Sequence, residues 1–242
     1  IDSYRKIRNT IRFLLGNLNN FTVNDAVELE QMPDLEKHIL NKISQMNNEL
    51  KSLVQRHDYH GIFVKLLNFC TLDLSAFYFD IRKDSLYCDS LNSKKRKNCV
   101  IVLNIILECL LKWFAPILVF TSEEIYNLVG KKNSIHEENF PKIPEGWKNQ
   151  KLNEKWAKLF KIKQVVNIAI EEKRGKKIIG SSLEADLSIS TDENNFNLLE
   201  GLDLAEYFIT SKAVKQKIDK KGDLKIEVNK AQGSKCPRCW KI

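Results

Sequence analysis

The chain has 242 residues, of which 43% are hydrophobic and 29% are charged, and its formal net charge is +8 with a pI near 9.1. This composition excludes a disordered or fibrous protein and allows one or two domains with a buried core. Only nine glycines and five prolines are present, which excludes most barrels and sandwiches of short strands joined by tight turns. We therefore expect a mainly α protein whose positive charge suits nucleic acid or an anionic membrane surface.

An amphipathic helix is predicted for residues 4–18. Its core face consists of apolar residues at helical spacing, namely Tyr4, Ile7, Ile11, Leu14, Leu15 and Leu18. Arg5, Arg8 and Arg12 fall together beside that face, so burial of the face would hold three guanidinium groups in a row at the surface. Such a row is suited to bidentate contacts with phosphate, although for an isolated helix a solvated basic flank is the simpler interpretation.

Further helices are expected up to about residue 146. After a loop at residues 19–32, Pro33 and Asp34 mark a helix start, and the helix has a seam made of Leu35, Ile39, Ile43, Met46, Leu50 and Leu53. A third helix is predicted for residues 62–81, followed by a polar segment through Ser93. The fourth is a long core helix at residues 94–114. These helices predict an antiparallel bundle.

Two features surround the end of that core helix. Its apolar run, residues 100–120, is long enough to suggest a membrane span, but Asn104, Glu108 and Lys112 draw a narrow polar stripe along it. We therefore expect a buried core helix and no membrane association. Pro116 then breaks the run, and the spacing of Thr121 and Glu124 predicts a capping box for a short helix ending near residue 130.

The pattern changes after the prolines and glycine at residues 141–146, which predict a boundary between domains 1–146 and 147–242. A connecting helix is expected at residues 150–174, with packing positions at Leu152, Trp156, Leu159, Val166 and Ile170. Alternating apolar residues then predict strands at residues 183–189 and 224–228 around a helix at residues 197–208. The second domain is therefore predicted to be a small α+β unit.

Candidate catalytic and metal-binding residues are few. The segment 175–181 lacks the order of residues that a Walker phosphate loop needs. His57 and His60 flank Asp58, but without a third ligand we favour solvated or capping histidines over a metal site. The six cysteines are too scattered for a disulfide framework and no signal pattern begins the chain, so a reducing, cytoplasmic location is expected.

The strongest chemical signal is the segment Lys235-Cys236-Pro237-Arg238-Cys239-Trp240. Cys236 and Cys239 have the spacing with which two thiolates hold one Zn²⁺, and we favour such a zinc knuckle over a redox pair because no thioredoxin-like context is apparent. A structural zinc needs four ligands, so the two cysteines are half a site.

Five blocks of residues are recognisable in order along essentially the whole chain. They are Lys6-Ile7-Arg8-Asn9-Thr10 with Arg12-Phe13-Leu14-Leu15, Ala115-Pro116-Ile117-Leu118 with Phe120-Thr121-Ser122-Glu123-Glu124-Ile125, Ser134-Ile135-His136, Ile179-Gly180-Ser181-Ser182-Leu183-Glu184-Ala185, and Cys236-Pro237-Arg238-Cys239-Trp240. The chain resembles the C-terminal anticodon-binding region of bacterial-type isoleucyl-tRNA synthetases, which are class I aminoacyl-tRNA synthetases. The last two blocks favour isoleucine over the valyl, leucyl and methionyl relatives. Tyr126 departs from the tryptophan usual there.

The resemblance implies a fragment of an isoleucine-tRNA ligase, which attaches isoleucine to its tRNA using ATP. Nothing here resembles the family's Rossmann catalytic core, its Lys-Met-Ser-Lys-Ser loop or its editing domain, so ATP should bind only in a catalytic domain that this chain lacks. The chain alone is expected to be inactive, monomeric, and a partner of the catalytic and editing domains of the same enzyme. The family's ribbon has a second cysteine pair beyond residue 242, so we expect Cys236 and Cys239 to hold zinc only as half of that site.

The implied function is to hold the anticodon stem and loop of isoleucine tRNA. We expect Arg5, Arg8 and Arg12 to face the stem backbone and Arg238 and Trp240 to meet the loop, since phosphates take cations and unstacked bases take aromatic and edge contacts. Weaker candidates for the backbone are Lys6, Lys94, Lys95 and Arg96. The alternative is a helical scaffold that binds protein and has no RNA affinity, which would present an apolar patch where the RNA hypothesis requires a basic one.

Overall fold

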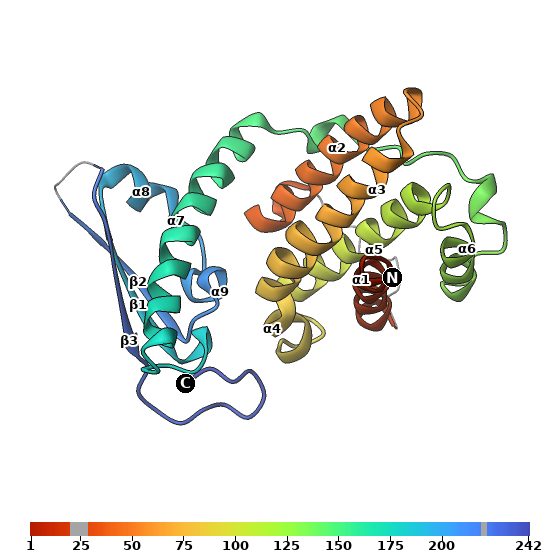
Figure 1. The fold of residues 1–242 in the computed structure, drawn as a ribbon. Helices are drawn as coiled ribbons and strands as arrows, with labels where there is room; N and C mark the ends of the chain where they lie inside the picture. The colour runs from red at the N-terminus through yellow and green to blue at the C-terminus, as the bar shows by residue number, and fades with distance from the viewer. Residues whose placement is uncertain (20–28, 219–221) are drawn as a thin grey trace. The chain divides into compact units, whose positions relative to one another are not determined.

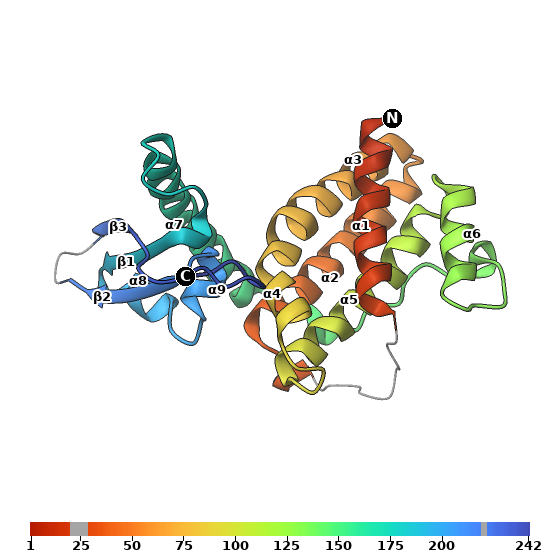
Figure 2. The same ribbon diagram turned by 90° about the horizontal axis from the view of Figure 1, so that it is seen from below.

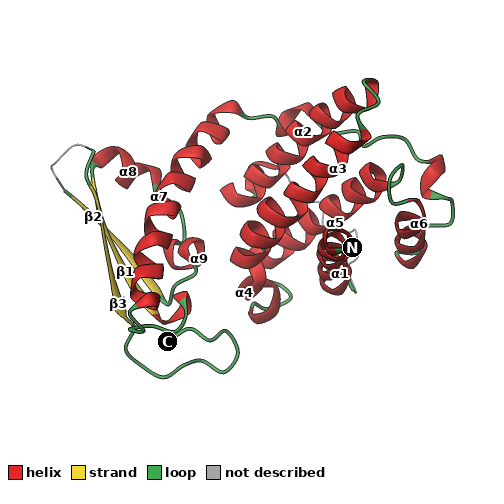
Figure 3. Cartoon of the chain, in the orientation of Figure 1, coloured by secondary structure: helices red, strands yellow, loops and turns green. Residues whose placement is uncertain are grey.

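The computed structural model describes residues 1–19, 29–218 and 222–242 and divides into two compact units, Ile1–Asn149 and Gln150–Ile242 (Figure 1). Helices make up most of the described chain, and the described strands all belong to one small sheet in the second unit (Figure 3). The predicted class, mainly α with a small α+β part, is therefore confirmed. Most of the loop expected at residues 19–32 lies outside the described residues.

The first unit is a bundle arranged around one long helix (Figure 2). Its helices are α1 (Asp2–Leu18), α2 (Asp34–Gln55), α3 (Tyr59–Asn68), α4 (Asp80–Cys88), α5 (Lys94–Phe114) and α6 (Val119–Leu128). Short 3₁₀ turns lie at Leu29–Gln31, Ile135–Glu137 and Glu145–Trp147. The central helix is α5, because it contacts α1, α2, α4 and α6.

The predicted apolar stripes form the core of this bundle. Ile7, Ile11 and Leu14 of α1 are buried, as is the α2 seam except for Met46, which is half-buried. On α5 the polar stripe is where the sequence places it, since Glu108 is exposed and Asn104 is half-buried while the rest of the helix is largely inside. The prediction of a buried core helix at this position is confirmed.

The third predicted helix is longer than expected and changes its winding midway. A π-helical segment, Phe69–Phe79, joins α3 to α4 without interruption. A π-helix is rare and is bonded from residue i to i+5. The carbonyl of Cys70 also accepts a hydrogen bond from the Ser75 hydroxyl at 2.8 Å, and Thr10 of α1 places its hydroxyl 3.1 Å from that of Ser75. Side chains therefore stabilise the π segment and tie it to α1.

The continuous run Tyr59–Cys88 is also long and apolar enough to cross a membrane by length and composition, with a mean hydropathy of 1.4 in its most apolar window. Part of this run lies inside the bundle, where Phe69, Leu74 and Ile81 are buried, whereas Leu72 is 63% exposed. The core helix of a helical bundle passes the same test of length and composition.

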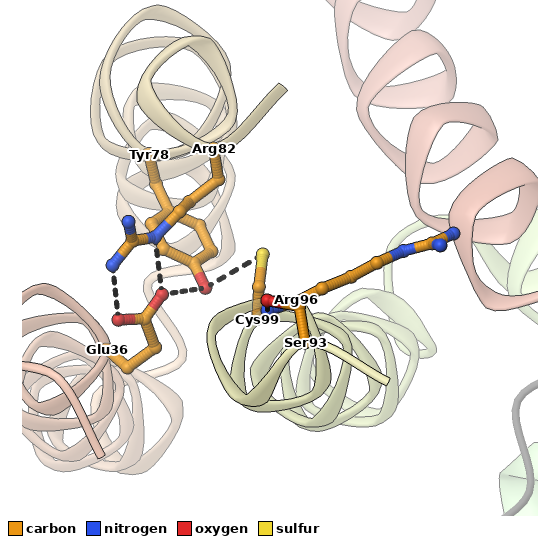
Figure 4. A network of polar contacts seen from close by, with 6 residues as sticks. All are labelled: Glu36, Tyr78, Arg82, Ser93, Arg96 and Cys99. Carbon is orange, nitrogen blue, oxygen red and sulfur yellow. Dashed lines mark hydrogen bonds and ion pairs between the residues drawn. The ribbon is translucent and has the colours of Figure 1, made fainter. Parts of the chain in front are cut away.

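A buried ion pair joins α2 to α4 (Figure 4). The Arg82 guanidinium donates two hydrogen bonds to the Glu36 carboxylate, from Nε to Oε1 at 2.7 Å and from Nη2 to Oε2 at 2.6 Å. The Tyr78 hydroxyl lies 3.2 Å from Glu36 Oε1 and 3.5 Å from the sulfur of Cys99. Because both charges are fully desolvated, the bidentate geometry is what makes the pair tolerable.

The second unit packs helices on a three-stranded sheet. Its elements are α7 (Gln150–Gly175), a 3₁₀ turn at Ser182–Glu184, β1 (Ala185–Thr191), α8 (Glu193–Leu198), α9 (Leu204–Phe208), β2 (Lys212–Lys217) and β3 (Leu224–Lys230). The strand order is β2-β1-β3, with β1 parallel to β2 and antiparallel to β3. Trp156, Leu159, Val166 and Ile170 of α7 are buried as predicted, and Leu152 is half-buried.

Two expectations from the sequence are wrong in detail, and one strand was missed. The helix predicted for residues 197–208 is two short helices, α8 and α9, each capped by an aspartate: Asp192 accepts from Asn195 N and Asp203 from Glu206 N. The strand β2 was not expected. The capping box at Thr121 is absent because α6 begins two residues earlier, and the Thr121 hydroxyl meets Tyr4 instead.

Candidate nucleic-acid interface

The arginine row of α1 is at the surface, beside a buried stripe. Ile7, Ile11 and Leu14 are at most 2% exposed and fix the rotation of the helix, which leaves Arg5, Arg8 and Arg12 exposed. These positions follow one another at spacings of three and four, so the three guanidinium groups lie along one side of the helix. The exposed row is the arrangement that backbone phosphates of a nucleic acid would meet.

Two members of the row have polar neighbours that orient them without neutralising the row. Arg8 Nη1 donates to the Tyr4 hydroxyl at 3.1 Å, and that hydroxyl lies 3.0 Å from Thr121 Oγ1. The hydrogen bond with Thr121, and then that with Arg8, lowers the pKa of Tyr4, while the bond to Tyr4 raises the pKa of Arg8. Arg5 Nη1 lies 3.5 Å from Asp2 at an exposed site, where such a pair contributes little.

A second group of cations occupies the first turn of α5. Lys94 is exposed and donates to Gln31 Oε1 at 3.3 Å, whereas Lys95 and Arg96 are half-buried and Arg96 Nη1 lies 3.4 Å from the carbonyl of Asp89. The cap is Ser93, whose hydroxyl accepts from Arg96 N at 3.5 Å. Figure 4 shows the Arg96 side chain directed away from the Glu36 pair. Lys6 is exposed on α1, off the row.

The cations at the start of α5 occupy an electrostatically unfavourable position. The N-terminal end of a helix carries a partial positive charge, so anions are stabilising there and cations are not. Lys94, Lys95, Arg96 and Lys97 nevertheless fill the first turn of α5, which contains no acidic residue. A bound polyanion would relieve this repulsion, which makes the turn a candidate phosphate contact.

The cysteine segment forms a tight turn at the surface of the second unit. Trp240 N donates to the carbonyl of Cys236 at 3.0 Å, and Cys236 N donates to the carbonyl of Lys241 at 2.8 Å. Hydrogen bonds from the backbone amides of Cys239 and Arg238 lower the pKa of the Cys236 thiol. Trp240 is 60% exposed, with Lys235 Nζ 5.7 Å from its ring centroid. An exposed indole beside Arg238 is suited to stacking on an unpaired base.

Two of the recognised blocks meet in this unit. The Glu184 carboxylate accepts from Gly180 N at 2.9 Å, and this bond, together with the positive charge of Lys235, lowers the pKa of Glu184 against the opposing effect of burial. Lys235 Nζ lies 3.7 Å from the same carboxylate. Ser211 bridges them too, because it accepts from Ile242 N at 2.7 Å and donates to the carbonyl of Leu183. These contacts fix the base of the cysteine turn.

The residues present do not complete a zinc site by themselves. Within residues 1–19, 29–218 and 222–242, no cluster of three or more histidine, cysteine or acidic side chains is placed to hold a metal. A structural zinc requires four ligands, so Cys236 and Cys239 would be only two of them. At the other candidate, Asp58 Oδ1 accepts from Gly61 N at 2.8 Å and caps α3, while His57 and His60 are exposed. The two histidines are therefore solvated, as expected, and the cap of α3 is Asp58, which the sequence did not identify.

The sequence did not identify the supporting side chains. Tyr4 was assigned to the core face and Thr121 to a helix cap, yet together they hold Arg8. In a further pair of recognised blocks, Glu123 accepts from Ser134 Oγ and Ile135 N, both at 2.9 Å, and these bonds lower its pKa. Tyr126 is buried with its hydroxyl 2.8 Å from Glu138, so its pocket accommodates the departure from tryptophan. Helical spacing alone does not reveal such long-range partners.

The fold and its exposed cations define a basic helical-bundle protein with a small α+β unit. Residues 36–189 match the family described as the anticodon-binding domain of tRNA ligase. Because the match covers more than half of the chain, the protein belongs to this family.

The similar proteins are all tRNA ligases for the same amino acid, isoleucine. The chain is 51% identical over 245 residues to an isoleucine–tRNA ligase of Pelagibacter ubique, an alignment that covers 100% of this chain and 27% of that protein. It is 37% identical over 243 residues to the isoleucine–tRNA ligase of Gluconobacter oxydans, covering 99% and 25%, and 38% identical over 253 residues to that of Agrobacterium fabrum, covering 100% and 26%. The chain thus spans about a quarter of the length of these relatives. The resemblance to isoleucyl-tRNA synthetases is confirmed.

Proposed function

We propose that this chain binds the anticodon stem and loop of isoleucine tRNA as part of an isoleucine–tRNA ligase. The observation that carries the proposal is the exposed row of Arg5, Arg8 and Arg12, set by the buried stripe of α1. Contacts to phosphate supply most of the sequence-independent affinity of proteins for nucleic acid. Further backbone contacts are Lys6 and the α5 cations Lys94, Lys95 and Arg96, and Arg238 and Trp240 meet the loop.

The rest of the reaction belongs to other parts of such an enzyme. In this proposal the catalytic and editing domains of the same ligase are the protein partners, ATP is used in the catalytic domain, and the chain acts in the cytoplasm as a monomer. Cys236 and Cys239 would contribute two ligands to a zinc that needs two more.

A protein scaffold without RNA affinity is the second candidate. It is favoured by apolar side chains at the surface of α6, where Phe120 is 89% and Leu128 is 70% exposed. This surface and the arginine row consist of different residues, so mutation separates the two hypotheses.

The test is the salt dependence of tRNA binding. The triple variant Arg5→Gln, Arg8→Gln, Arg12→Gln should bind an isoleucine tRNA transcript more weakly than the unchanged chain. The slope of log affinity against log salt should flatten by roughly one unit for each phosphate that the variant no longer binds. Fluorescence anisotropy at several salt concentrations measures both quantities, and Phe120→Ser is the matched control. A slope unchanged by the triple replacement favours the scaffold.

A further inference from the structure

A shallow groove of about 440 Å³ is lined by residues of α1 and α4, where the arginine row ends. Its lining residues are Asn9, Arg12, Phe13, Gly16, Asn17 and Tyr87. The five from α1 are spaced i, i+3, i+4, i+7 and i+8, so they form a single stripe along that helix. Arg12 belongs both to this stripe and to the arginine row, which makes the groove continuous with the row.

The groove has an aromatic wall that is held in place from below. Phe13 stacks on Phe79, with ring centroids 4.4 Å apart and an interplanar angle of 19°. Tyr87, in the last turn of α4, meets Phe13 edge-on at 6.5 Å and 76°, and it remains 53% exposed. A fixed aromatic ring that is still open to solvent is the usual platform for an unstacked nucleobase.

Polar groups surround this aromatic wall. Arg12 and Asn9 are both exposed at the groove. Asn17 is fixed by a hydrogen bond from its Nδ2 to the carbonyl of Phe13 at 2.8 Å. A guanidinium can pair with a phosphate, and an asparagine amide offers both donors and an acceptor to a base edge. With the aromatic wall, these groups offer one nucleotide three contacts, to its base face, its base edge and its phosphate.

Gly16 points to the same conclusion independently. It lies within α1, where glycine is the poorest helix former after proline. Packing does not require it, because a Cβ built there meets no heavy atom of the described residues within 4 Å. What the missing side chain does provide is open space in the groove beside Arg12 and Tyr87.

We propose that this groove is a subsite for one unstacked nucleotide of the bound tRNA. The base stacks on Tyr87, its edge meets the Asn9 amide, and its phosphate pairs with Arg12. This inference rests on the proposed function and adds a base-binding position to a row that otherwise contacts only backbone. A cationic and amide-lined groove at the end of three arginines suits a nucleotide better than an apolar peptide.

The test compares tRNA binding by variants that change stacking, space or neither. Tyr87→Ala should weaken binding of the isoleucine tRNA transcript about tenfold with an unchanged salt slope, because no charge is removed, and Tyr87→Trp should restore it. Tyr59→Ala removes a comparably exposed tyrosine from α3 and should have no effect. Gly16→Leu fills the groove with a better helix former, so it should weaken binding while the melting temperature holds or rises. Gly16→Ala is its matched control and should keep full affinity.

Two results would overturn the subsite. The first is full tRNA affinity in both Tyr87→Ala and Gly16→Leu. The second is a loss of tRNA affinity in Tyr87→Ala that Tyr87→Trp does not restore, together with full affinity in Gly16→Leu. If the Arg5, Arg8 and Arg12 replacements still flatten the salt slope in that case, only the subsite fails. If the unchanged chain does not bind tRNA at all, the proposed function fails with it.

Discussion

His38 shows how the burial of one side chain sets a response to pH. It is 2% exposed on α2, with the Phe77 ring edge-on at 6.3 Å. Desolvation, and then the positive charge of Lys42, lowers its pKa to about 3. Lys42 is itself paired with Asp73 at 3.0 Å. The imidazole is therefore neutral in the folded protein and titrates near 6.5 only when the chain unfolds.

The first unit should lose stability in acid because of this residue. Between about pH 3 and 6.5 the unfolded chain binds one more proton at His38 than the folded chain, so the stabilisation is complete above 6.5 and declines as the pH falls. Lowering the pH from 7 to 5 should reduce the free energy of unfolding by about 2 kcal/mol. Urea titrations at both pH values measure it. His38→Gln should remove most of this difference and His60→Gln, at an exposed site, should not; equal differences in both variants would contradict the assignment.

Among single residues, the pairing of buried polar side chains is what the sequence does not predict. Helical spacing correctly placed Arg5, Arg8 and Arg12 outside and Ile7 inside, because each depends only on neighbours within two turns. The Glu36–Arg82 pair joins positions 46 residues apart, and nothing in the local pattern of α2 or α4 distinguishes it from a surface charge. Such pairings depend on how the helices pack.

At the scale of elements, α5 combines a core helix with an electrostatically unfavourable first turn. Replacing Lys94 and Lys95 by glutamate should stabilise the helix by about 0.3–1 kcal/mol per residue, since anions suit the positive end of a helix. The same changes should weaken tRNA binding and flatten its salt dependence if the turn contacts phosphate. Thermal unfolding and fluorescence anisotropy measure the two effects, and the neutral pair Lys94→Gln, Lys95→Gln should give smaller changes of the same sign. A double-glutamate variant that binds tRNA as tightly as before would remove these lysines from the interface.

Elements with a strong apolar period were predicted well, and those without one were not. The bounds expected for α5 agree with the structure because its apolar residues extend along the whole helix. The strand β2 has little such signal: it is an edge strand whose residues are exposed or half-buried, and three of its six are lysines. Charged edge strands avoid pairing with other sheets, which also makes them hard to detect. Likewise α8 and α9 are each less than two turns long and are defined by their aspartate caps.

At the scale of the whole molecule, charge in the sequence and charge at the surface are differently distributed. Residues 210–242 contain ten Lys or Arg against three Asp or Glu, which gives this stretch a net charge of +7. In the folded second unit, however, acidic partners meet several of these lysines: Glu200 pairs with Lys215, Glu193 with Lys217 at 3.0 Å, and Glu227 with Lys225 at 2.9 Å. The sequence therefore overstates the basic surface that the strand lysines provide in this unit.

Both units should contribute separately to one tRNA complex. The triple glutamine variant removes phosphate contacts from the first unit, and Arg238→Gln with Trp240→Ala removes loop contacts from the second. Because the two sets of residues belong to separate compact units, their effects on the binding free energy should add to within about 0.5 kcal/mol. The titrations need low salt, where the combined variant still binds measurably. The pair Arg238→Gln, Trp240→Ala, here called the tail replacement, could weaken tRNA binding in the otherwise unchanged chain and have no effect in the triple glutamine variant. That result would show that the second unit depends on the arginine row for its own contact. An unchanged affinity after the tail replacement in either background would leave the first unit as the sole RNA-binding part of this chain.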